Sequence, residues 1–338
     1  MTFRTKLLAA AALLLGGCAS DTVGSEAGEG TIRFLGRYVP FITELRDGEP
    51  VHQVRVDSSP DRPLSAALFA SEGDTVWGVK DDALAHWDLA SESLLEEVPL
   101  PTDAEYADLF VADDAVWLAG GHGTVWVTKV TKRPLEVAAT LKIEGKWFNG
   151  AHATQNGLDV LVSNHAELLR IDPASVTVSK RVDLNPKAGI ADMVVVGDQY
   201  WIALRGQWAE IRFARLSVAD LSMLEASTEP APWPGHEGSY GYQSPMANAH
   251  AIYAPRVMYA DGRVTGCIVR VPLRDPSLVH DLYCVDPELE TAHFEDFLVD
   301  DDSVWVLDDG YGGFARVDAT TGDVLARIDE FPAEGFFR

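Results

Sequence analysis

One phrase recurs six times along the chain and limits the folds open to it. Each copy has a small residue beside an acidic residue, alanine or histidine, then an apolar run, a polar turn and a Val-Trp-like pair. The copies occupy residues 66–77, 107–117, 151–161, 191–201, 249–259 and 295–305, with anchors 40, 44, 40, 58 and 46 residues apart. This period fits a propeller blade of four strands, and no helical period persists outside the first residues. The sequence therefore predicts an all-β fold, a β-propeller of six blades with four antiparallel strands each.

The strands that follow each copy support this interpretation. A third strand often ends in Asp, as in Leu-Arg-Ile-Asp-Pro at 169–173 and Ala-Arg-Val-Asp at 315–318. These strands, with the Val-Trp-Val runs, resemble the broad group of bacterial propellers that includes PQQ-like, YVTN and streptogramin-lyase-like repeats. The resemblance covers residues 66 to about 330 and implies a fold, not an activity. Residues 32–39 and 51–57 add two strands that either close the ring against the last blade or begin a seventh, within one domain of residues 31–338.

The first thirty residues have the pattern of an export signal and a tether. Arg4 and Lys6 precede an apolar run at 7–15 that ends in Gly16-Gly17-Cys18, and this run is too short to span a membrane. Residues 15–18 resemble the bacterial lipoprotein box, which implies that 1–17 are removed and that Cys18 is acylated. Residues 18–30 then form a flexible tether. Ala19 implies outer-membrane sorting under the enterobacterial rule; an ordinary secretory signal is the alternative.

The net charge restricts which partners the chain can bind, and the cysteines indicate the compartment in which it is located. With 27 basic and 52 acidic residues the net charge is −25, so nucleic acid is excluded as a partner. Cys267 and Cys284 lie at equal distances from a turn at Asp275-Pro276, so a hairpin there places them opposite each other. We predict a disulfide, which an oxidising envelope compartment permits.

One set of polar residues predicts a site at the mouth of the central channel. Nine residues before five of the six anchors stand Asp108, His152, Asp192, His250 and Asp296. Equivalent residues of inner strands ring a propeller axis, and two imidazoles with three carboxylates suit a divalent transition metal. The alternative is structural, with these side chains capping backbone groups or holding channel water.

Further candidates lie on the same predicted face. Lys80, Asn164, Arg205 and Asp308 follow the anchors, and Lys80 or Arg205 would hold an anionic group of a ligand. His152, His165 and Arg205 are the candidate catalytic residues, with a histidine as base. Trp233 and Tyr240 lie in a Pro- and Gly-rich insertion that forms either a lid or carbohydrate-stacking surface, or packs on itself.

Three functions follow from these features. The first is a lipid-anchored propeller of the bacterial cell envelope, in the outer membrane rather than the inner, that binds a small molecule, glycan or envelope protein at one channel face. The second is a metal-dependent hydrolase or lyase that uses the Asp/His ring. The third is an assembly scaffold that adds a partner strand to a blade edge. The sequence leaves open whether the chain is an enzyme.

Overall fold

The computed structural model is entirely β in the parts of the chain that it describes. These are residues 31–36, 41–46, 49–56, 65, 68–163, 166–184, 190–205, 211–226, 245–260, 263–275, 278–285, 294–308, 313–328 and 333–336. Among them there is no helix long and apolar enough to cross a membrane. The chain divides into two compact units, Met1–Thr102 with Glu288–Arg338, and Asp103–Pro287. The predicted signal, tether and Cys18 lie outside the described residues.

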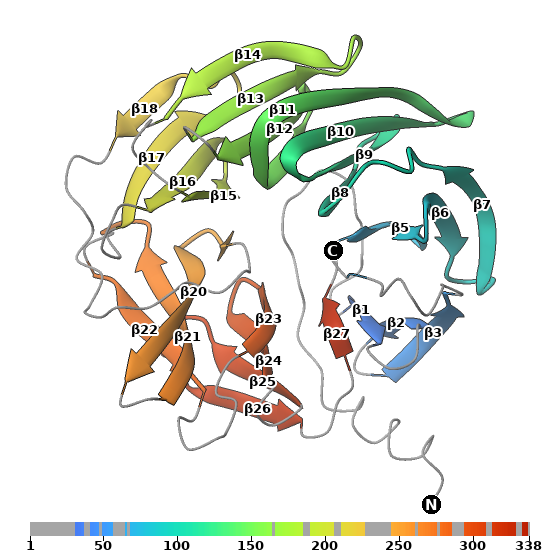
Figure 1. Ribbon diagram of the computed structural model, residues 1–338. Coiled ribbons are helices and arrows are strands. Elements are labelled where there is room, and N and C mark those ends of the chain that lie inside the picture. Colours follow the sequence, from blue (N-terminus) through green and yellow to red (C-terminus); the bar gives the residue numbers. More distant parts are fainter. Residues whose placement is uncertain are drawn as a thin grey trace, which may run out of the picture. The chain divides into compact units, whose positions relative to one another are not determined.

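The first unit contains three four-stranded sheets (Figure 1). One has the order β27-β1-β2-β3, with β27 (Ala333–Phe336), β1 (Thr31–Gly36), β2 (Phe41–Arg46) and β3 (Glu49–Arg55). The next consists of β4 (Phe69–Glu72), β5 (Thr75–Lys80), β6 (Ala83–Asp88) and β7 (Ser93–Pro99). The third consists of β23 (Phe294–Val299), β24 (Ser303–Asp308), β25 (Gly313–Asp318) and β26 (Val324–Ile328).

The second unit contains one seven-stranded and two four-stranded sheets. The long sheet runs through β8 (Asp108–Val111), β9 (Ala115–Gly120), β10 (His122–Lys132), β11 (Leu135–Thr154), β12 (Gly157–Ser163), β13 (Glu167–Asp172) and β14 (Thr177–Asp183). One four-stranded sheet consists of β15 (Ile190–Val196), β16 (Gln199–Arg205), β17 (Ile211–Ser217) and β18 (Met223–Ala226). The other consists of β19 (Met246–Ala247), β20 (Ala251–Ala260), β21 (Arg263–Pro272) and β22 (His280–Cys284).

Strand β11 is shared by two halves of the seven-stranded sheet. Its residues 135–147 pair with β10, and its residues 147–154 pair with β12. Trp147 is the one described residue at which both ladders meet. The long sheet is therefore two four-stranded ladders, β8–β11 and β11–β14, that share one continuous strand.

The two ends of the described chain meet in one sheet. Strand β27 pairs antiparallel with β1, with Phe336 opposite Phe34. The sequence left open whether the strands at 32–39 and 51–57 close against the last blade or begin a seventh. The structure places them in a sheet of their own, completed by the C-terminal strand (Figure 1).

Apolar cores lie between neighbouring sheets within a unit and between the two halves of the seven-stranded sheet, which explains why the second strands are apolar on both faces. One core joins Leu35, Ile42 and Val54 of the first sheet to Val76 and Trp87 of the next. Strand β9 is buried along its whole length, as is β12. A strand with neighbours on both faces reads as a continuous apolar run rather than an alternating one.

A charged pair or a cation–aromatic pair recurs at one register in every ladder. The second and third strands place these residues opposite each other: Arg33–Glu44, Trp77–His86, Trp117–Lys129, Asp159–Arg170, Trp201–Arg215, Tyr253–Arg270 and Trp305–Arg316. His86 stacks on Trp77 with ring centres 3.8 Å apart, and Arg215 and Arg316 lie 5.1 and 5.2 Å from their indole rings. A cation over an indole face is attracted by the ring's quadrupole. From Arg33 to Trp305, the residues that the second strands contribute to these pairs follow one another at spacings of 44, 40, 42, 42, 52 and 52 residues.

This register corrects two of the predicted anchors. In the β11–β12 hairpin the anchor is Asp159, two residues before Leu161. In the β19–β20 hairpin it is Tyr253, six residues before Tyr259. The predicted anchors share apolar or aromatic character, whereas the feature that repeats in the structure is a second-strand residue paired with a basic or charged residue of the third strand.

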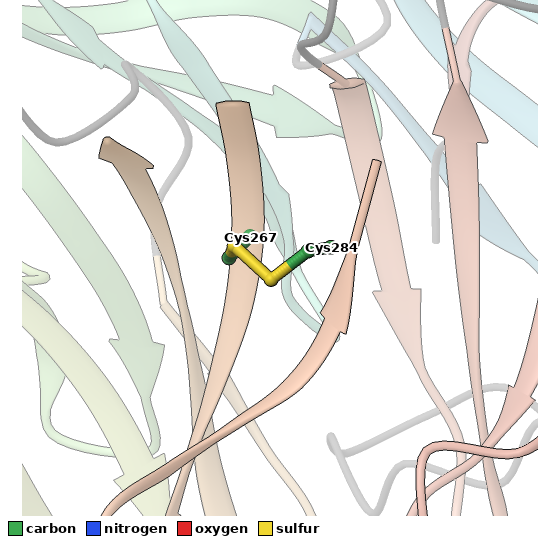
Figure 2. The surroundings of a disulfide bond; sticks show 2 residues. All are labelled: Cys267 and Cys284. Atoms are coloured by element: carbon green, nitrogen blue, oxygen red, sulfur yellow. A yellow bond between two sulfur atoms is a disulfide. The ribbon is translucent and has the colours of Figure 1, made fainter. Parts of the chain in front are cut away.

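The predicted disulfide is present. Cys267 on β21 lies directly opposite Cys284 on β22, with their Cα atoms 4.0 Å apart (Figure 2). Cys267 is fully buried. The bridge therefore fastens the outermost strand of this sheet to its neighbour.

Removing this bridge should lower stability measurably. A disulfide that spans 17 residues restricts the unfolded chain, so Cys267→Ser with Cys284→Ser is expected to cost about 2–4 kcal/mol. Thermal melting with and without reductant checks this. The double variant is the control, because its midpoint should not respond to reductant, and a wild-type midpoint equally insensitive to reductant would contradict the prediction.

Candidate functional site

Three aspartates of the predicted ring share a register. Asp108 pairs with Ala119, Asp192 with Ala203 and Asp296 with Leu307, and each partner lies two residues after its tryptophan anchor. Asp108 is the first residue of β8 and Asp192 the third of β15, both in the second unit, whereas Asp296 belongs to the first. The side chains of Asp192 and Asp296 lie outside the described residues.

The two histidines do not share that register, so the structure corrects the predicted ring. His152 lies opposite Asp159, two residues farther along its strand, and Gly150 takes the position equivalent to Asp108. His250 lies in the turn between β19 and β20, where its amide donates to Asn248 Oδ1, and its side chain is exposed. Both errors follow from the shifted anchors. Among the described side chains, Asp108, His152 and His250 form no cluster with metal-ligand spacing.

Asp108 lies at the edge of an apolar core. Phe110, which alternates with Asp108 along β8, and Ala112, just after this strand, pack against the core formed by Trp117 and Ala119 of β9 with residues of β12. Alternate residues of a strand share a face, so the carboxyl of Asp108 faces this same core. Burial there raises its pKa to about 7, because the charged form loses water without gaining a partner.

No described group hydrogen-bonds to or ion-pairs with the Asp108 carboxyl. Asp108 is half-buried, and a carboxyl that titrates near neutrality marks a candidate functional site. The chain on either side is closely packed, because a Cβ on Gly120 would lie 2.4 Å from the amide of Ala107. The backbone is therefore tightly placed next to a carboxyl that has no hydrogen-bond partner in the described part of the chain.

His152 lies beside a buried hydrogen-bond network. Its ring meets the edge of Tyr200 with centres 5.8 Å apart, and burial lowers its pKa although nearby Asp159 opposes this. Asp159 accepts hydrogen bonds from Arg170 Nε at 2.7 Å and from the Tyr200 hydroxyl at 2.6 Å. A neutral, half-buried imidazole of this kind packs the junction of two sheets.

The other predicted ligand residues are paired or lie outside the described residues. Lys80 Nζ is 3.1 Å from Glu97 Oε2, so its charge is already matched within the sheet. Asn164, His165, Trp233 and Tyr240 lie outside the described residues, as do the side chains of Arg205 and Asp308. Their roles stay predictions.

Two side chains at the same end of the long sheet were missed by sequence reasoning. Trp147 is 44% exposed, and the Ser163 hydroxyl is buried with no hydrogen-bond partner among the described residues. Trp147 could not be recognised as exposed because its neighbours read as an ordinary strand. We name this end, where β9 and β12 finish, the β9/β12 end; it includes Asp108, Trp147 and Ser163.

Solved structures show which fold this chain is similar to. Dihydro-heme d1 dehydrogenase NirN, determined in complex with DHE, matches 89% of this chain with a TM-score of 0.55 and 15% identity, and the chain spans 64% of that protein. Hydrazine synthase of Kuenenia stuttgartiensis matches 83% of this chain and 91% of its own, with a TM-score of 0.58 and 10% identity. The Pan2 WD40 domain of Neurospora crassa matches 87% of this chain and 86% of its own, with a TM-score of 0.52 and 13% identity.

These neighbours are propeller-type proteins, so they confirm the propeller fold and, at such identities, the fold alone. No protein-family model matches the chain. No curated protein sequence matches it either.

Proposed function

We propose that this chain is a seven-bladed β-propeller, lipid-anchored through Cys18 in a bacterial cell envelope, that binds a ligand or partner at the β9/β12 end. The observation that carries the binding function is Asp108, whose half-buried carboxyl meets no hydrogen-bonding or charged group among the described residues and has a pKa raised to about 7. Ionising this carboxyl costs free energy in the unliganded protein. A cation or a hydrogen-bond donor of a ligand lowers that cost and so gains binding free energy.

The count of seven blades rests on the repeated register. Seven ladders of four strands carry a matched pair at one position, and the first ladder is completed by the C-terminal strand. In a closed propeller such a shared sheet joins the two ends of the chain. Regular spacings of 40 to 52 residues between the anchors support seven equivalent units.

Binding at one end is better supported than strand addition at a blade edge. In six of the seven ladders the pairing of third and fourth strands shifts register immediately after the matched residue on the third strand. A bulge bends and twists an edge strand and so blunts its pairing with another chain. The outer edges are therefore poor templates for a partner strand.

Native mass spectrometry of the full chain tests the binding function. A ligand retained from the expression host appears as added mass, and Asp108→Asn should lose it because the new amide offers no charge. Elemental analysis of the same sample tells whether the ligand is a metal ion. Equal added mass on wild type and Asp108→Asn, or none on either at saturating host extract, contradicts a ligand at Asp108.

The lipid anchor has a separate test. Labelled palmitate should be incorporated into the wild-type chain, which sediments with membranes, whereas Cys18→Ser should be unlabelled and appear in the soluble fraction. A Cys18→Ser variant that still sediments with membranes after a salt wash contradicts anchoring by this residue.

A further inference from the structure

Trp147 differs from the other described tryptophans in its exposure. Six of these seven are at most 7% exposed and fill the cores between sheets, whereas Trp147 is 44% exposed. An indole left in water forgoes the stabilisation of about 2–3 kcal/mol that burial of a large apolar side chain gives. An exposed aromatic that no core requires is typical of a binding surface.

Trp147 is the centre of a row of three side chains that crosses the β9/β12 end. On one side it pairs with His122 of β10, and on the other with Ser163 of β12. Residues directly opposite each other in antiparallel strands project from the same face of a sheet. The rings of His122 and Trp147 stack with centres 4.5 Å apart and planes 15° apart, so the imidazole covers one indole face.

The backbone holds the indole in place and leaves space beside it. Trp147 is fixed by both ladders of β11, and the neighbouring Lys146 pairs with Glu167 at 3.0 Å. Gly145 and Gly150 have φ angles of +70° and +147°, and a Cβ on either would meet no atom within 4 Å. Positive φ at two positions around one tryptophan gives the strand a shape that other residues rarely adopt.

The row also contains an unused hydrogen-bonding group. Ser163 is 2% exposed, and its Oγ has no partner among the described residues. A buried hydroxyl without a partner costs about 1–3 kcal/mol. Because Ser163 Oγ has no access to solvent, a ligand removes this cost only by displacing the side chains that cover it. The row thus combines an exposed indole, one face of which His122 covers, with a buried hydroxyl on the residue paired with it.

We propose that the row His122–Trp147–Ser163 is a binding subsite for a neutral saccharide. A sugar ring presents an apolar C–H face to an indole and hydroxyls at its rim, which matches this combination of groups. Polyanionic glycans are disfavoured because the chain carries a net charge of −25. This inference rests on the proposed binding function and names a class of ligand for the β9/β12 end.

Calorimetry on the full chain in a zwitterionic, sugar-free detergent tests the subsite. The probes are cellotetraose and chitotetraose, with polygalacturonate as an anionic comparison. We expect a neutral tetrasaccharide to bind, Trp147→Ala to weaken binding about tenfold or more, and Trp147→Phe to weaken it less, because a phenyl ring retains part of the stacking face. Ser163→Ala should weaken binding severalfold.

Leu278→Ala is the matched control, because Leu278 is 61% exposed and lies just before β22, outside the long sheet. It should bind as the wild type does. Failure of both neutral sugars to bind, binding of polygalacturonate alone, or equal affinity of Trp147→Ala at an unchanged melting midpoint overturns the saccharide assignment. The native mass measurement on Asp108→Asn does not depend on these sugars. It therefore tells whether a negative calorimetry result rules out only the saccharide or also ligand binding at Asp108.

Discussion

Replacing Asp159 by asparagine is expected to destabilise the chain by about 3–5 kcal/mol, among the largest single effects we anticipate. Asp159 is fully buried and accepts three hydrogen bonds, two from Arg170 and one from Tyr200. Arg170 is itself buried and extends to the next sheet, where it donates to the carbonyls of Val218 and Ala219. Without the carboxylate, the guanidinium is left in the core with no counter-charge.

Urea denaturation of three variants separates this network from ordinary packing. Arg170→Met should cost a similar amount to Asp159→Asn, since it leaves the buried carboxylate uncompensated. The double change Asp159→Leu with Arg170→Met should recover much of the loss, because a buried ion pair is often replaceable by apolar residues of similar volume. A double variant as unstable as the sum of the single ones would contradict this account.

An exposed ion pair of the same sheet provides the control. Lys142 Nζ lies 3.0 Å from Asp103 Oδ2, with both side chains more than half exposed. Asp103→Asn should leave the denaturation midpoint almost unchanged, because solvent already screens that pair. A similar response at both sites would mean that burial does not decide the strength of these interactions here.

The strands and the disulfide were predictable because each leaves a local signal. Apolar runs bounded by acidic turns identified the second strands of most ladders, and equal distances from a proline turn placed Cys267 opposite Cys284. The first ladder left no such signal, because its inner strand comes from residues 333–336, at the other end of the chain. Pairing across so many residues depends on tertiary structure alone.

The candidate site was harder to predict than the fold, for a physical reason. All seven ladders have a matched pair at this register, but the residue types vary: Asp159 stands where other ladders have Trp or Tyr. Anchors predicted from aromatic or apolar character therefore lie two residues too far along the chain at Leu161 and six too far at Tyr259. In a strand a shifted register changes which neighbours a side chain meets, and so His152 and His250 were wrongly aligned with Asp108.

Asp108→Asn is expected to stabilise the chain at neutral pH and not at acidic pH. The folded protein holds a proton on Asp108 up to about pH 7, whereas the unfolded chain releases it near pH 3.8. Folded stability is therefore lost as the pH rises from about 4 to about 7 and stays low above that. At 1.4 kcal/mol per pH unit the penalty reaches at most about 4 kcal/mol, which the neutral asparagine does not incur.

Denaturation midpoints at pH 4.5 and pH 8 measure this difference. Asp113→Asn is the matched control, because Asp113 is exposed in the turn that follows the same strand, and its midpoint should follow the wild type at both values. A carboxyl retained at such a cost is explained by a task that only the carboxyl performs, since substitutions that stabilise a protein commonly impair its function. If Asp108→Asn is instead less stable than the wild type at pH 8, the carboxylate is already satisfied in the free protein, and the main reason for placing a ligand beside it disappears.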